Sequence, residues 1–167
     1  MKYLSVSRDV GAVHPLDVVE KIVDENDWTS DRQGNREIVV QAPGRWCNYS
    51  LYFTWNEDLG AVHFTCAFDL RAPAERRAAM HELLALINEK VCLGHFGLWD
   101  EEGLPMYRHA LLLRGAGGPS REQMEDMVDA AIMESDRFYP AFQHVIWGGR
   151  TAHESVSAAM VDTIGEA

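Results

Sequence analysis

The feature that most restricts the fold is a change of hydrophobic period along the chain. Between residues 28 and 70, three runs rich in β-branched and aromatic residues appear, REIVVQA, WCNYSLYFTW and AVHFTCAFDL. The turn-forming stretches RQGN, APG and NEDLG lie between or before them. Apolar positions that recur every second residue, with short polar connections, are typical of neighbouring antiparallel strands. The region therefore predicts three or four strands with one face more apolar than the other.

Helical spacing flanks this region on both sides. The stretch HPLDVVEKIVDENDW carries Pro15 in a favoured first-turn position, followed by an apolar stripe at three- and four-residue steps. A second helix is predicted in APAERRAAMHELLALINEKV, after Arg71. A third is predicted after Ser120, which has the spacing of a capping box with Gln123. Pro140 is expected to kink or end that helix.

A hairpin is predicted between the second and third helices. The stretch CLGHFGLWDEEGLPMYRH, Cys92 to His109, places two apolar runs around the polar turn DEEG. The element order is then α-β-β-β(β)-α-β-β-α, which predicts an α+β fold with helices packed on an antiparallel sheet. The length of 167 residues predicts a single domain over 1–167, with a core from about 14 to 150 and a helical tail over 151–167.

Charge and cysteine content restrict the class of function. The net charge is −11, and no cluster of Lys and Arg could form a face for nucleic acid, so we expect none to bind. No window is apolar for long enough to span a membrane, and no signal peptide precedes the first helix. The three cysteines are odd in number and widely spaced, which is atypical of a disulfide framework. We expect a cytoplasmic protein that binds no membrane.

The predicted hairpin concentrates side chains that could carry chemistry. His95 and His109 are the strongest candidates for metal ligands. Zinc needs three or four ligands, however, and no HExxH, HxH or CxxC spacing supplies the others. The three carboxylates of DEEG lie in a tight turn, where solvent leaves them no reason to hold a proton at neutral pH. We therefore predict no metal and no acid–base pair here.

Two further patterns in the sequence are candidate sites. Cys47 lies two residues after Arg45, on the same face of a strand, which is a weak arrangement for a nucleophile. The other cysteines are predicted to lie in the core or near the end of the second helix. The glycine-rich stretch GAGGPSRE could offer backbone N–H groups to an anion, although it lacks the GK[ST] ending of a P-loop. Without a convergent catalytic set, we predict no enzyme and no cofactor.

Aromatic residues are more numerous than one core needs. They crowd the predicted strands, the hairpin and the last helix, so a surplus is expected on a partner surface or dimer interface. Trp99, Tyr107 and His109 are the candidate partner surface. The alternative is a small-molecule-binding or enzymatic site near His95, Arg108 and His109, within the Cys92–His109 hairpin.

Three segments together resemble a known family. FTWNEDLGAVHFTCAFDL, LLALINEKVCLGHFGLWDEEGLPMYRHALLLRG and FYPAFQHVIWGG are similar to YbjN-domain proteins, in particular to their alphaproteobacterial branch. The resemblance implies a fold similar to type III secretion chaperones, commonly dimeric, and a role as a bacterial sensory transduction regulator. It brings no catalytic motif to any residue. With this resemblance, we predict a non-enzymatic, homodimeric protein-binding module with a regulatory or chaperone-like role, whose partner is another protein or peptide segment.

Overall fold

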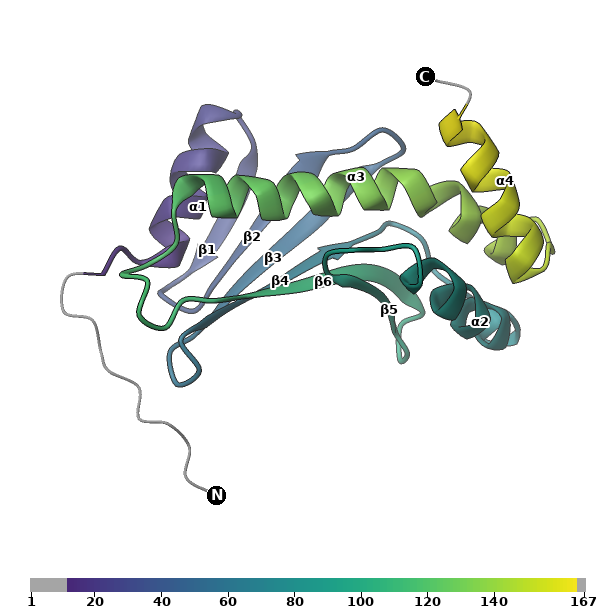
Figure 1. Cartoon of the computed structure of the whole chain (residues 1–167), viewed down its shortest axis with the longest axis horizontal. Coiled ribbons are helices and arrows are strands. Elements are labelled where there is room, and N and C mark those ends of the chain that lie inside the picture. Colours follow the sequence, from purple (N-terminus) through teal and green to yellow (C-terminus); the bar gives the residue numbers. More distant parts are fainter. Residues whose placement is uncertain (1–11, 165–167) are drawn as a thin grey trace.

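The structure is a computed structural model that describes residues 12–164 of the chain. Over these residues the helices and strands alternate in the predicted order, with a 3-10 turn, η1 (Ala74–Arg76), before the second helix (Figure 1). The elements are α1 (Pro15–Glu25), β1 (Thr29–Gln33), β2 (Glu37–Pro43), β3 (Asn48–Asn56), β4 (Ala61–Ala67), α2 (Arg77–Asn88), β5 (His95–Trp99), β6 (Leu104–Leu112), α3 (Arg121–Ile146) and α4 (Ala152–Ile164).

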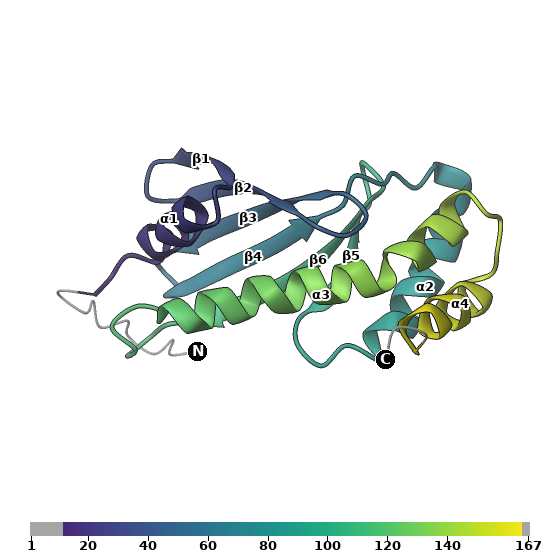
Figure 2. The same ribbon diagram turned by 90° about the horizontal axis from the view of Figure 1, so that it is seen from above.

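All strands belong to one antiparallel sheet in the order β1-β2-β3-β4-β6-β5. The predicted α+β class is confirmed, and four strands precede α2, the larger of the two numbers that the sequence allowed. α1 and the long α3 lie over one face of the sheet, whereas α2 and α4 pack together at one end (Figures 1 and 2). The sheet therefore has a helix-covered face and an opposite face that these helices do not cover.

Alternation along the strands fills the core beneath α1 and α3. Two rows of paired residues face the helices and are buried, except where the first row reaches His109 on β6. These rows are Ile38–Phe53–Phe64–His109 and Val40–Leu51–Cys66–Tyr107. Because side chains on one strand alternate between faces, the same register sends the intervening residues to the uncovered side.

Phe68, just after β4, is the centre of an aromatic cluster between the sheet and α3. Its ring lies 5.5 Å from Tyr49, 5.2 Å from Phe142 and 6.1 Å from Phe96, measured between ring centroids. The ring of Tyr139 is also within 5.8 Å. Tilted and edge-on arrangements of this kind suit the aromatic quadrupole. The cluster joins β3, β5 and the C-terminal half of α3.

Helix ends follow the sequence signals. The His14 side chain accepts a hydrogen bond from the Leu16 N–H at 3.2 Å and so caps α1. The predicted capping box of Ser120 and Gln123 is present at the start of α3.

Pro140 does not end α3, which continues to Ile146. Figure 2 shows the helix changing direction in its C-terminal part, in line with the alternative of a kink. The residues that follow the proline explain why the helix continues, because Phe142 and Val145 are fully buried in the core. Tertiary packing thus compensates for the backbone hydrogen bond that proline removes.

The loop between β2 and β3 anchors α3 to the sheet. Asp136 of α3 accepts hydrogen bonds from the Tyr49 hydroxyl at 2.8 Å and from the Arg45 N–H at 2.9 Å. The Trp46 indole N–H donates to the backbone carbonyl of Asp136 at 2.9 Å. The Trp46 ring also stacks on Tyr139. These bonds fix where α3 lies along the sheet.

α4 forms within the predicted helical tail and continues the core. Ala152, Val156 and Ala159 of this helix are buried, and residues 165–167 lie outside the described part. The division into one domain with a core over 14–150 and a tail stays a prediction. None of the helices described is long and apolar enough to cross a membrane.

Replacing Phe68 by alanine should lower the free energy of unfolding by about 3–5 kcal/mol, because it leaves a cavity at the centre of the aromatic cluster. Urea denaturation followed by tryptophan fluorescence measures the change. Met133 on α3 is 62% exposed, so Met133→Ala is the matched control and should change stability by less than about 0.5 kcal/mol. Equal effects for the two substitutions would contradict this account of the core.

Candidate functional site

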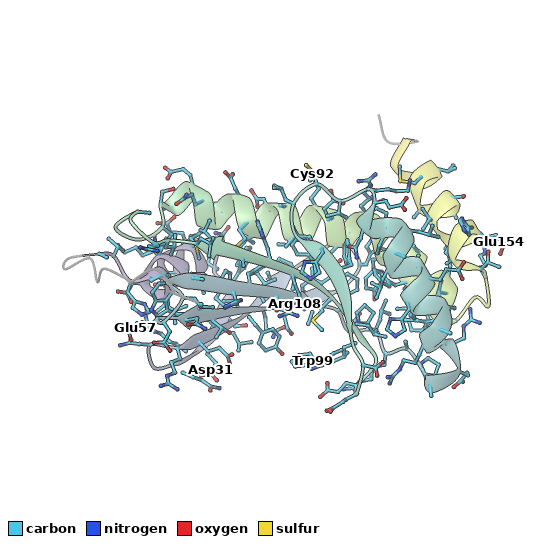
Figure 3. All side chains as sticks on the ribbon, turned by 60° about the horizontal axis from the view of Figure 1, so that its bottom comes forward. Asp31, Glu57, Cys92, Trp99, Arg108 and Glu154 are labelled. Atoms are coloured by element: carbon cyan, nitrogen blue, oxygen red, sulfur yellow. The ribbon has the colours of Figure 1, made fainter. Side chains whose placement is uncertain are left out.

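The candidate site is the sheet face opposite α1 and α3, which we call the open face. It combines polar, charged and apolar side chains, none of them fully buried. Figure 3 views the molecule from this side and shows Asp31, Arg108 and Trp99 there. Its members alternate with the core residues and are Thr29, Asp31, Gln33, Glu37, Val39, Gln41, Ser50, Tyr52, Thr54, His63, Thr65, His95, Gly97, Trp99, Leu104, Arg108 and Ala110.

The strand register aligns the open face in rows across the sheet. One row, which we call the central row, runs Asp31–Val39–Tyr52–Thr65–Arg108–His95 from β1 to β5. A row of the same length, Thr29–Gln41–Ser50–Ala67–Met106–Gly97, contains Ala67 and Met106, which are buried and are therefore not counted in the open face. The next row runs Gln33–Glu37–Thr54–His63–Ala110. Carboxylates therefore lie on β1 and β2, whereas the arginine and a histidine lie on β6 and β5.

The structure does not bring Trp99, Tyr107 and His109 together on one surface. Trp99 is on the open face and 48% exposed, whereas Tyr107 is completely buried on the helix-covered face. His109 shares the covered side with Tyr107, opposite Phe64. The register of the hairpin could have shown this. Trp99 pairs with Leu104 and shares its face, whereas Tyr107 and His109 lie three and five residues after Leu104 on the same strand and therefore point to the other face. Of the three, Trp99 alone belongs to the open face.

Tyr107 instead holds the loop before β5. Its hydroxyl donates to the Leu93 carbonyl at 2.6 Å, and its ring packs edge-on against Phe96 at 5.4 Å. Gly94, with φ of 65°, passes so close to this ring that a Cβ there would collide with it. Burial raises the pKa of Tyr107 to about 12, so the phenol stays protonated at neutral pH. Its role is structural.

The alternative site near His95, Arg108 and His109 is divided between the two faces. His95 and Arg108 are register partners on the open face, whereas His109 lies on the covered side. Burial, and in lesser part the charge of His95, lowers the pKa of His109, so its ring is neutral at pH 7. Among the described residues, no group of three or more His, Cys, Asp or Glu side chains could hold a metal ion.

The carboxylates of the hairpin turn face solvent and α2. Asp100 pairs with Arg77 at 3.3 Å, and all three carboxylates are exposed. Gly103 closes the turn with φ of 70°, as the sequence suggested. A Cβ at this glycine would collide with the Ala72 carbonyl. The turn thus ties the hairpin to the start of α2, and its acidic side chains form no acid–base pair.

None of the three cysteines has the surroundings of an activated nucleophile among the described residues. Burial, with the nearby Asp69 carboxylate, raises the pKa of Cys47 to about 12, which outweighs its proximity to Arg45 along the chain. Burial likewise raises the pKa of Cys66 to about 12, and its sulfur lies 3.6 Å from the Ser135 hydroxyl. Cys92 is exposed in the loop after α2, with no base placed to activate it by a hydrogen bond among the described residues.

Both edges of the sheet resist addition of another strand. The Asn88 side chain accepts a hydrogen bond from the Phe96 N–H at 2.7 Å and donates to the Phe96 carbonyl at 3.0 Å. It thereby occupies both outward groups of that residue on β5. On β1, Arg32 points back to α1 and pairs with Asp17 at 2.8 Å and Glu20 at 2.6 Å. Such inward charges are a known protection of edge strands.

A cavity of about 850 Å³ lies at the end of the sheet, where α1 begins and the β3–β4 and β6–α3 loops meet. Gly115 and Gly118 of the glycine-rich stretch contribute to its wall. The charged side chains there have both signs, Arg36 and Arg114 against Glu57 and Asp58, so the cavity has no clear preference for an anion.

Comparison with known proteins assigns the family. The family model described as "Putative bacterial sensory transduction regulator", YbjN, matches residues 15–144. The chain belongs to the YbjN family. The predicted family resemblance is thereby confirmed, and the family is described as regulatory rather than enzymatic.

A solved structure supports the YbjN fold. "Crystal structure of YbjN, a putative transcription regulator from E. coli" matches with a TM-score of 0.52 and 12% sequence identity, covering 75% of this chain and 89% of that one. No curated protein matches the chain. At this identity the likeness concerns the fold, and the side chains of the open face have to be interpreted from this chain alone.

Thiol labelling at pH 8 should modify Cys92 first and leave Cys47 and Cys66 unmodified while the protein is folded. The raised pKa of about 12 at both keeps them as thiols, and Cys66 is also sealed from reagent. Mass spectrometry after iodoacetamide treatment measures the sites, and all three should label in denaturant. Cys92→Ser is the control and should abolish labelling of the folded protein. Rapid labelling of Cys47 would refute its assignment as an unreactive thiol.

Replacing Asn88 by alanine should uncover the β5 edge. The Phe96 N–H and carbonyl lose their partners, so we expect a loss of about 1–3 kcal/mol in the free energy of unfolding. Hydrogen exchange followed by NMR should show faster exchange at the Phe96 amide. Asn48→Ala, at an exposed position of β3, is the control. Unchanged exchange at Phe96 would show that Asn88 does not protect the edge.

Proposed function

We propose that this YbjN-family chain is a non-enzymatic protein-binding module with a regulatory or chaperone-like role in a bacterial cytoplasm, and that it works as a homodimer. The observation that carries the proposal is the open face, a sheet surface of mixed polarity that ends in the half-exposed Trp99. Aromatic side chains in such positions are enriched at protein interfaces. The regulatory description of the family agrees with this role.

The blunted edges support binding on the face. The Asn88 clamp and the inward Arg32 remove the positions where an extended segment would add to the sheet. A partner then contacts side chains rather than backbone groups. Trp99 stands at the hairpin end of the face, and Leu104 beside it is half-buried. Together they provide an apolar anchor for a partner protein or peptide segment.

The alternative of a small-molecule or enzymatic site at the Cys92–His109 hairpin has less support. His109 and the pair His95–Arg108 lie on opposite faces. Tyr107 is committed to the loop before β5. The large cavity at the sheet end also lies away from this hairpin, with none of its wall coming from residues 92–109. We therefore propose one function rather than two.

Capture from a lysate of the native bacterium tests the role of Trp99. The wild-type chain should retain a specific protein that Trp99→Glu loses, because the charge disrupts the apolar anchor without touching the core. Trp147→Glu is the matched control, since Trp147 is 67% exposed beyond the end of α3 and is not a member of the open face. Quantitative mass spectrometry compares the three captures. The proposal fails if no protein is retained specifically, or if the protein is lost with Trp147→Glu and kept with Trp99→Glu.

A further inference from the structure

The distribution of charge on the open face has an internal symmetry. Along the central row, Asp31 lies at the β1 end, while Arg108 and His95 lie on β6 and β5. Glu37, one row away, adds a second carboxylate on β2. Three uncharged residues, Val39, Tyr52 and Thr65, lie between the ends of the row. The midline of the sheet passes between β3 and β4.

Glu37 on β2 and Arg108 on β6 lie on strands equally far from that midline, in neighbouring rows, and Asp31 on β1 lies as far out as His95 on β5. β2 and β6 are the second strands out on either side, and β1 and β5 are the third. Neighbouring strands are about 4.8 Å apart, so β1 and β5 each lie about 12 Å from the midline. A surface with one sign of charge suits a partner of the opposite sign. A surface on which the two signs are arranged in this mirrored order suits a second copy of itself.

We propose that a second copy of this chain packs face to face on the open face, about a two-fold axis parallel to the strands and between β3 and β4. This inference rests on the homodimer of the proposed function and specifies its interface. The axis places β1 of one copy opposite β5 of the other and β2 opposite β6. Arg108 of each copy then lies over Val39 of the other, between Asp31 and Glu37. Tyr52 meets Thr65 at the centre.

The side chains of these pairs are free to make the contacts. Among the described residues, neither Asp31 nor Arg108 has an ion-pair partner within its own chain, and both are exposed. Glu37 has one long contact, the Thr54 hydroxyl at 3.3 Å. Sheets that pack face to face lie about 10 Å apart, a distance that an arginine side chain can bridge to a carboxylate on the opposite sheet. The charge pairing also fixes which strand meets which.

The interface leaves the hairpin end available. Trp99 lies four residues along β5 from His95, about 13 Å from the central row at the rise of a strand. The second copy and a partner protein therefore use different parts of the open face. This separation allows the two proposals to be tested independently.

Charge reversal with rescue tests the inference by sedimentation equilibrium of the full chain. Arg108→Glu should raise the dimer dissociation constant at least about tenfold, because like charges then face each other. Asp31→Arg with Glu37→Arg should do the same. The variant that combines all three reversals should restore a dissociation constant within about threefold of wild type, since the pairs are re-formed with their signs exchanged.

Matched controls separate the interface from net charge. Lys90→Glu changes the net charge as Arg108→Glu does, and Asp126→Arg with Asp129→Arg matches the double acidic reversal; all lie at exposed positions off the open face. These controls should leave the dissociation constant unchanged. Raising the salt concentration should weaken the wild-type dimer through the same pairs, a measurement that depends on no variant.

Each other result has a definite meaning. A dimer that tolerates both reversals and is insensitive to salt overturns the open-face interface and leaves the homodimer of the proposed function in place. A wild-type chain that is monomeric at about 100 μM, well above the dissociation constants of stable dimers, refutes the proposal that a second copy binds the open face. If such a monomer still captures its partner through Trp99, the protein-binding role stands by itself.

Discussion

The attachment of α3 to one face of the sheet is the constraint on which the rest of the structure depends. Asp136 and the indole of Trp46 fix the helix to the β2–β3 loop, and the ring of Phe68 joins it to the strands. A sheet with one face committed in this way sends every second side chain of each strand to the opposite side. The open face exists because α3 and α1 occupy the other.

This arrangement decides on which face of the sheet each polar side chain of the β5–β6 hairpin lies. Tyr107 is buried on the helix side, where its hydroxyl holds the loop before β5. His95 and Arg108 face the opposite way and join a row that ends at Asp31. A stretch that looks dense in reactive side chains is thus divided between packing and surface. Its side chains therefore do not converge on one site.

Edge protection and face exposure act together. Asn88 closes the β5 edge with two hydrogen bonds, and Arg32 turns the β1 edge toward α1. Both devices hinder the addition of a further strand at these positions of the sheet edges. The open face, by contrast, presents side chains rather than unpaired backbone groups.

The local elements and their order could be predicted from the sequence, because hydrophobic period, caps and turn residues act over a few positions. The β2–β4 alternation, the Ser120–Gln123 capping box and the Gly103 turn were all predictable on that basis, and all are present. Only the tertiary structure decided which strands are neighbours, so only it placed Asp31 and Arg108 in one row, 77 positions apart in the chain (108 − 31). It also decided that Pro140 continues α3, because the burial of Phe142 and Val145 outweighs the lost hydrogen bond. Contacts between residues distant in sequence depend on sheet order and register, and no local pattern encodes either.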